Sequence, residues 1–151
     1  MKQRHRIRRR VWILAIGLLQ ALWLPGCGSE ASSDTEPATV VTLVTENFNG
    51  SIEQNGSRVH TFTVTNAGYS LLAGLTSLSP SSITALGLGI GSWDSSTSTC
   101  SLNVSQNNTA RSGSTGLSAT PGSGDYCLRV YDGGNIPAGV TASYTVQIQH
   151  Y

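Results

Sequence analysis

The feature that most constrains the fold is a two-residue alternation of apolar and polar side chains, which starts at Val40 and continues to the chain end. Within 58–65, His60, Phe62 and Val64 share one face, while Val59 and three threonines share the other. This period, with many β-branched residues, is typical of half-buried strands, and no convincing helical pattern occurs. The sequence therefore predicts an all-β, antiparallel, jelly-roll-like β-sandwich of about seven or eight strands. A closed barrel is the alternative.

Gly, Asn, Ser and Pro residues divide this part of the chain into short segments. Because Asn55-Gly56 is a strong turn signal, we expect the first two strands to pair as a hairpin. The polar stretch 106–116 is predicted to be a mobile loop. Strands are expected over 46–53, 58–65, 69–78, 83–93, 99–105, 117–120, 125–132 and 143–151.

The segment 83–93 has an unusual face. Leu86, Leu88 and Ile90 alternate with glycines at positions 87, 89 and 91, so one side of the expected strand carries no side chains. Glycine within a strand often marks a close approach of another part of the chain. We therefore expect a neighbouring loop to pack flat against this face, with a partner or ligand as the alternative. The GxGxG spacing lacks a third glycine and a following helix, which argues against a dinucleotide site.

The N-terminal segment has the composition of an export signal. Six basic residues precede Val11, and 11–24 is an apolar run interrupted only by Gln20. Fourteen helical residues reach about 21 Å, which is short of the roughly 30 Å hydrocarbon core of a bilayer. This length favours a cleaved signal peptide, and an uncleaved anchor helix is the alternative.

The apolar run ends in Leu24-Pro25-Gly26-Cys27, which resembles the lipobox of bacterial lipoproteins. The resemblance implies cleavage before Cys27 and a lipid on its thiol, so that the mature chain is anchored to a membrane. The expected organisation is a signal peptide over 1–26, a lipidated Cys27 with a flexible linker over 27–40, and a β-sandwich over 41–151. Gly28, rather than Asp, follows the cysteine, which in bacteria with two membranes implies the outer membrane. Whether the domain faces the periplasm or the outside is left open.

Charge excludes one class of partner. Six of the nine basic residues lie in the expected signal, so the remainder carries three basic and eight acidic residues, a formal net charge of −5. A mildly acidic chain without a basic cluster repels phosphate backbones, which argues against nucleic-acid binding.

The two cysteines that remain after Cys27 are Cys100 and Cys127. Export to an oxidising compartment predicts a disulfide between them, and two buried free thiols are the alternative. Closing a loop of about 28 residues would stabilise the fold by about 3–4 kcal/mol in the chain-entropy model.

Several motifs along the domain occur in a familiar order: 47–52 (NFNGSI), 60–64 (HTFTV), 124–132 (GDYCLRVYD) and 144–146 (YTV). Together they resemble the bacterial pre-peptidase C-terminal domain family, over about residues 45–149. The resemblance implies an exported, non-catalytic, jelly-roll-like sandwich that assists binding, secretion or surface attachment. The family often carries an Asp in its middle strand where this chain has 86–90 (LGLGI), and no protease domain accompanies it here.

Catalytic residues are sparse after the expected signal. Only His60 and His150 remain, and no serine lies in a Gly-x-Ser-x-Gly motif. We therefore expect a protein that is not an enzyme and carries no cofactor beyond the lipid. Asp132 and Asn135 offer oxygen ligands for calcium, but they lack the full alternating ligand pattern, which favours a turn-forming aspartate.

Aromatic residues are the remaining candidates for binding. Trp93, Tyr131 and Tyr151 could form a platform for a sugar, with Arg129 on the same face as Tyr131; packing within the domain is the alternative. The function expected is a non-catalytic binding or adhesion module for a polysaccharide or an envelope protein. The alternative is a structural or accessory envelope component without a small ligand.

Overall fold

The computed structural model describes residues 40–151, whose strands belong to one compact unit. The expected signal peptide, Cys27 and the linker up to residue 39 lie outside the described residues. No helix within the described range is long and apolar enough to span a bilayer. The eight strands are β1 (Val44–Ile52), β2 (Ser57–Val64), β3 (Leu71–Ser79), β4 (Leu86–Asp94), β5 (Thr99–Ala110), β6 (Ser114–Ala119), β7 (Gly124–Tyr131) and β8 (Ala142–His150).

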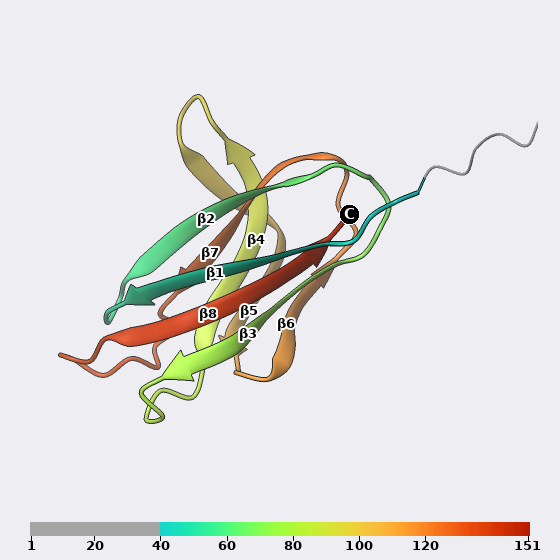
Figure 1. Ribbon diagram of the computed structural model, residues 1–151. Coiled ribbons are helices and arrows are strands. Elements are labelled where there is room, and N and C mark those ends of the chain that lie inside the picture. The colour runs from blue at the N-terminus through green and yellow to red at the C-terminus, as the bar shows by residue number, and fades with distance from the viewer. Residues whose placement is uncertain (1–39) are drawn as a thin grey trace, which may run out of the picture. The chain divides into compact units, whose positions relative to one another are not determined.

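The strands form two antiparallel four-stranded sheets (Figure 1). The first sheet has the order β1-β8-β3-β6 and the second has the order β2-β7-β4-β5. The chain crosses from one sheet to the other at every connection except β4–β5. An eight-stranded double sheet wound in this way is a jelly roll, so the predicted fold class is confirmed.

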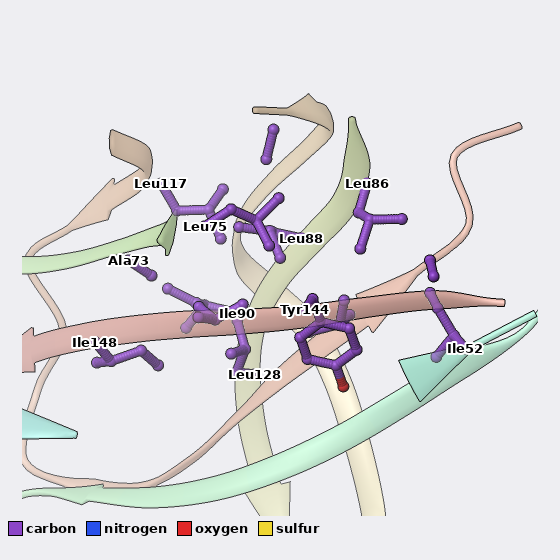
Figure 2. Packing of buried hydrophobic residues seen from close by; sticks show 14 of the residues in the cluster. Ile52, Ala73, Leu75, Leu86, Leu88, Ile90, Leu117, Leu128, Tyr144 and Ile148 are labelled. Carbon is purple, nitrogen blue, oxygen red and sulfur yellow. The ribbon is translucent and has the colours of Figure 1, made fainter. Parts of the chain in front are cut away.

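The core lies between the two sheets and follows the predicted alternation (Figure 2). Leu86, Leu88 and Ile90 of β4 are fully buried, as are Val146 and Ile148 of β8. On β8 the alternate side chains, Thr145, Gln147 and Gln149, point away from the core, whereas the opposite face of β4 carries glycines at positions 87, 89 and 91. The period of two therefore fixes which face of each strand is buried.

The predicted hairpin between the first two strands is wrong, although the turn itself forms. Asn55 has a positive φ of 59°, and the Gly56 amide donates to the Glu53 carbonyl at 2.9 Å. However, β1 pairs with β8, and β2 pairs with β7. The turn carries the chain from the first sheet to the second, because β1 and β2 each pair with a strand from the C-terminal half of the domain.

The predicted mobile loop over 106–116 is also wrong. β5 continues to Ala110, with Asn107 opposite Leu88 and Ala110 opposite Leu86. The Asn107 amide also donates to the Gly116 carbonyl at 2.9 Å, which ties β5 to β6. Only 111–113 turn the chain. β5 lies at a sheet edge with mostly polar, outward side chains, so its sequence lacks the apolar alternation that marks a strand.

Neighbouring strands, rather than a loop, cover the glycine face of β4. A Cβ on Gly87 would meet the Tyr131 ring of β7, and a Cβ on Gly89 would lie 2.8 Å from the Leu102 side chain of β5. At Gly91 the obstacle is the backbone carbonyl of Ser101. Because β4 has glycine at these three positions, side chains and backbone of β5 and β7 can lie across it.

Candidate functional site

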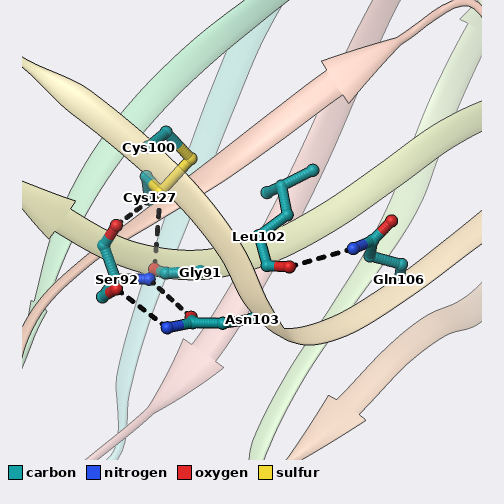
Figure 3. The surroundings of a disulfide bond; sticks show 7 residues. All are labelled: Gly91, Ser92, Cys100, Leu102, Asn103, Gln106 and Cys127. Atoms are coloured by element: carbon teal, nitrogen blue, oxygen red, sulfur yellow. Dashed lines mark hydrogen bonds between the residues drawn. A yellow bond between two sulfur atoms is a disulfide. The ribbon is translucent and has the colours of Figure 1, made fainter.

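The predicted disulfide between Cys100 and Cys127 is confirmed (Figure 3). It joins β5 to β7 across β4, with a Cα–Cα distance of 5.8 Å. The carbonyl oxygens of Gly91 and Ser92 lie 3.4 and 3.5 Å from Sγ of Cys127. These are packing contacts, because a disulfide sulfur carries no proton. β5 can curl over β4 to reach Cys127 because Gly91 has no side chain.

The candidate aromatic residues do not form one platform. Trp93 lies opposite Cys100 near the end of β4, whereas Tyr131 lies opposite Gly87. Six strand residues separate these two points, a distance of roughly 20 Å. The Tyr131 hydroxyl donates to Oδ1 of Asn108, so this ring packs within the second sheet. Tyr151 follows β8 in the first sheet.

Arg129 is exposed on the outer face of β7, two residues before Tyr131, as predicted from the alternation. Its guanidinium donates to the Ser57 hydroxyl at 3.1 Å. Tyr151 contacts a different aromatic residue, Tyr69, with ring centroids 5.0 Å apart. The predicted binding residues therefore lie in three separate places.

The Asp132 carboxylate stabilises two turns by accepting hydrogen bonds from their backbone N–H groups. Its Oδ1 accepts the backbone N–H groups of Gly134, Asn135 and Ile136, and its Oδ2 accepts that of Asn55. Burial raises the pKa of this carboxyl, but the four N–H donors outweigh burial and hold the pKa below its usual range. Asn135 contributes its backbone N–H group to one of these turns. Among the described residues, no group of three or more His, Cys, Asp or Glu side chains is placed to hold a metal ion.

Both histidines of the domain have polar partners. Nε2 of His60 lies 2.9 Å from the Tyr144 hydroxyl, and Nε2 of His150 lies 2.8 Å from Oε1 of Glu46. The His150–Glu46 pair has the His–acid geometry of a hydrolase, but His150 is buried and its ring packs 5.5 Å from Phe62. Nδ1 of His150 is buried without a hydrogen-bond partner, so no hydroxyl nucleophile is placed on the ring.

An open groove of about 380 Å³ lies on the outer face of the first sheet. Its floor is the outward face of β3 and β8, and its wall is the start of β6. A Cβ on Gly74 would lie 2.6 Å from the Ser114 carbonyl oxygen, so the absence of a side chain there lets β6 fold over β3. The lining residues are Leu72, Ala73, Gly74, Leu75, Thr76, Gly113, Ser114, Thr115, Gln147 and Gln149.

The groove lining contains no charged residue. Several of its polar groups are already used within the fold. Nε2 of Gln147 donates to Asn47 at 3.3 Å, the Thr76 hydroxyl donates to the Thr145 carbonyl, and the Ser114 hydroxyl donates to the Arg111 carbonyl. Within residues 40–151, the Gln149 amide and the Thr115 hydroxyl have no such partner. These two groups can therefore bond a ligand without breaking an internal hydrogen bond.

Sequence reasoning missed this groove. In the sequence, Gln147 and Gln149 are simply polar residues that alternate with Val146 and Ile148, and Gly74 lies in no special pattern. These residues come together because β8 pairs with β3. The register of β3 is also irregular, between Ala73 and Gly74 and between Leu75 and Ser77. Local sequence shows neither. A run of uncharged amides on one strand face was the only available signal.

No protein-family model and no curated protein matches the chain. Among solved structures, it is similar to the crystal structure of Aeromonas hydrophila PliG, a periplasmic lysozyme inhibitor of g-type lysozyme. The TM-score is 0.47 with 17% sequence identity, covering 69% of this chain and 83% of the other. A similarity at this level does not indicate what the chain binds.

Proposed function

We propose that this chain is a lipid-anchored envelope protein whose jelly roll binds a neutral polysaccharide without catalysing a reaction. The proposed anchor is Cys27, on the basis of the lipobox-like sequence and the basic and apolar segments before it. The proposed location is the outer membrane, because Gly28 rather than Asp follows the cysteine. The resemblance to the pre-peptidase C-terminal domain family supports the same class of exported binding module.

The observation that carries the proposal is the uncharged groove on the outer face of the first sheet. Its volume of about 380 Å³ lies within the range of roughly 300–1,000 Å³ typical of small-molecule sites. Amide and hydroxyl groups both donate and accept hydrogen bonds, which matches the hydroxyl groups of a sugar. Leu72 adds an exposed apolar surface against which the C–H face of a sugar ring can pack.

The composition of the groove favours a neutral saccharide over other ligands. Protein interfaces are enriched in aromatic residues, Met and Arg at their centres, and the lining has none of these. An acidic polysaccharide would find no cation in the groove and would be repelled by the net charge of −5 that follows the expected signal. A neutral, hydroxyl-rich saccharide needs no cation in the groove and is not repelled by the acidic domain.

The absence of catalysis is proposed from the use of the histidines. His60 is bonded to Tyr144 and His150 to Glu46, and neither histidine lines the groove. A ligand bound in the groove therefore has no imidazole beside it to act as general base.

The proposal is tested by screening soluble residues 28–151 against neutral and acidic envelope polysaccharides. We expect binding to neutral chains only, with loss of binding in Gln149→Ala and Leu72→Ser. Gln54→Ala, an exposed glutamine in the β1–β2 turn, is the matched control and should bind normally. Trp93→Ala should also bind normally, because Trp93 does not line the groove.

Failure of the folded domain to bind any polysaccharide would overturn the ligand class and favour the accessory envelope role without a small ligand. Binding that Trp93→Ala abolishes and Gln149→Ala leaves intact would place the site on the second sheet instead. Cys27 is tested separately, by labelling the full chain with palmitate in cells. We expect label in the wild type and none in Cys27→Ala.

A further inference from the structure

Exposed apolar side chains gather at the end of the sandwich where the chain enters. Of the seven large apolar side chains that are exposed within residues 40–151, four lie at this end, and Tyr151 lies among them. The other three are Leu72 in the groove, Val59 on β2 and Val104 on β5. We call the cluster the anchor-side patch. It consists of Val40, Leu43, Val44, Tyr69 and Tyr151.

Pairing at the end of β8 brings the patch together. Val44 lies opposite His150, the residue before Tyr151. The Tyr151 carbonyl accepts the backbone N–H groups of Thr65 and Asn66, which holds the β2–β3 loop against the chain end. Tyr69 in that loop packs on the Tyr151 ring. In Figure 1 the start of β1 and the chain end marked C lie on the same side of the domain.

The proposed anchor restricts what can cover this surface. Twelve residues, 28–39, connect Cys27 to Val40. At about 3.3–3.6 Å per extended residue, this segment spans at most about 40–45 Å. A short tether keeps the patch at an effective concentration of about millimolar near the bilayer, so even a weak contact is populated.

The chemistry of the patch fits the membrane interface. Tyrosine is enriched where a bilayer meets water, and apolar side chains gain free energy in the headgroup and acyl boundary. The three arginines of the described chain, at positions 58, 111 and 129, lie outside the patch. The nearby acids have hydrogen-bond partners within the domain: Glu46 is bonded to His150, and Asp125 accepts the Thr63 hydroxyl at 2.8 Å.

We propose that the anchor-side patch docks on the bilayer that carries the lipid anchor, through apolar and tyrosine contacts rather than charge. This inference rests on the proposed lipid anchor. A second copy of the chain is a poorer occupant, because a stable protein interface uses roughly 20–30 residues on each side and the patch has five. The contact should be insensitive to salt, since no basic side chain contributes to it.

The test attaches residues 27–151 to a nanodisc through the Cys27 thiol and a maleimide lipid. The other two cysteines form a disulfide, so the coupling is specific and does not depend on cellular lipidation. The domain contains all eight strands and the whole core, so it is expected to fold without residues 1–26. Gadolinium on the lipid headgroups then attenuates the NMR signals of residues close to the bilayer.

We expect the Leu43, Val44, Tyr69 and Tyr151 signals to lose most of their intensity, with no change at high salt. Val59 and Val104 are matched controls, because their exposures of 39% and 37% lie within one percentage point of the 38% of Val44. Their signals should stay strong. In the double variant Leu43→Ser with Tyr69→Ser, the attenuation at Val44 and Tyr151 should fall to the level of these controls.

Attenuation that is uniform over the domain would overturn docking, because a docked face must lie closer to the bilayer than the rest of the domain. Attenuation unchanged in the double variant would assign the effect to the tether alone and would also overturn it. Patch signals that broaden with protein concentration in the absence of nanodiscs would assign the surface to a second copy. Absence of palmitate label from the wild-type chain in cells would reject the proposed anchor and leave the nanodisc result unchanged, so the two failures are distinguishable.

Discussion

The Tyr144 hydroxyl of the first sheet lies 2.9 Å from Nε2 of His60 in the second sheet, and this contact joins the two layers. Burial raises the pKa of Tyr144 to about 12, although Arg58 opposes the shift. Tyr144 therefore stays protonated, and which of the two groups donates follows the tautomer of the His60 imidazole. Phe48 stacks on the imidazole of His60, with ring centroids 5.0 Å apart.

Stability should fall as the solution is acidified through the His60 titration. Burial and the positive charge of Arg58 lower the pKa of His60 below its ordinary value of 6.5. Below pH 6.5 the unfolded chain takes up a proton that the folded chain resists, so the free energy of unfolding decreases as pH falls. Urea unfolding at pH 7.5 and pH 5 measures this. His60→Gln should show a weaker pH dependence, and an equal dependence in both proteins would contradict the assignment.

Removing the Tyr144 hydroxyl should destabilise the domain without removing the ring from the core. Tyr144→Phe leaves Nε2 of His60 without its hydrogen-bond partner, and we expect a loss of about 1 kcal/mol in the free energy of unfolding. Tyr126→Phe is the matched control, because its hydroxyl donates to the exposed Gly122 carbonyl and can be replaced by water. Urea midpoints that fall equally in the two variants would show that the contact between the sheets contributes nothing special.

The disulfide should contribute a large part of the stability. It links residues 27 apart in sequence, and the chain-entropy model gives about 3–4 kcal/mol for a loop of that size. Replacing both Cys100 and Cys127 by Ala should lower the free energy of unfolding by that order. Trp93, the only tryptophan in residues 28–151, reports the unfolding by fluorescence. The same urea midpoint with and without the bond would be incompatible with this account.

Two glycines on the same face of β4 should respond differently to Ala. At Gly91 the added methyl meets the Ser101 backbone, which cannot move without shifting the disulfide-bonded strand. We expect Gly91→Ala to cost about 1–3 kcal/mol. At Gly89 the methyl meets the flexible end of Leu102, so Gly89→Ala should cost less. Thermal unfolding of the two variants compares them directly, and the reverse order would show that β5 does not lie over Gly91 as described.

Calcium should not change the stability of the domain. Both carboxylate oxygens of Asp132 already accept backbone N–H groups, so binding a cation there would break up to four hydrogen bonds. Melting temperatures should agree with added calcium and with a chelator. Asp132→Ala should melt lower in both conditions, because the turns it holds lose their acceptor. A melting temperature that rises with calcium and fails to rise in Asp132→Ala would restore the metal site.

Local patterns were enough to predict the fold class. The alternation at His60, Phe62 and Val64 and the buried face of β4 follow directly from the period of two. Strand pairing could not be predicted from local patterns, because the Asn55-Gly56 turn has the same sequence whether the strands on either side of it pair or belong to different sheets. The sequence pattern predicts a β5 that is too short for a related reason: at a sheet edge, pairing with β4 and the hydrogen bond of the Asn107 side chain hold the strand in place of an apolar pattern.

The candidate site could not be predicted from composition. Aromatic residues drew attention to Trp93, Tyr131 and Tyr151, yet their positions depend on which ends of the strands they occupy. The groove depends on residues that look ordinary in sequence, above all Gly74 and Gln149. Gly74 and Gln149 line a groove only because β6 folds over β3, which is a property of the assembled sheet.

The most direct measurement is NMR chemical-shift mapping of residues 28–151 during titration with a neutral polysaccharide fragment from the screen. The account predicts shifts that cluster on Leu72, Gly74, Thr115, Gln147 and Gln149, and that disappear in Gln149→Ala while Gln54→Ala behaves as wild type. Shifts that cluster instead around Trp93 or across Arg129 and Tyr131 on the second sheet would contradict the groove as the binding site.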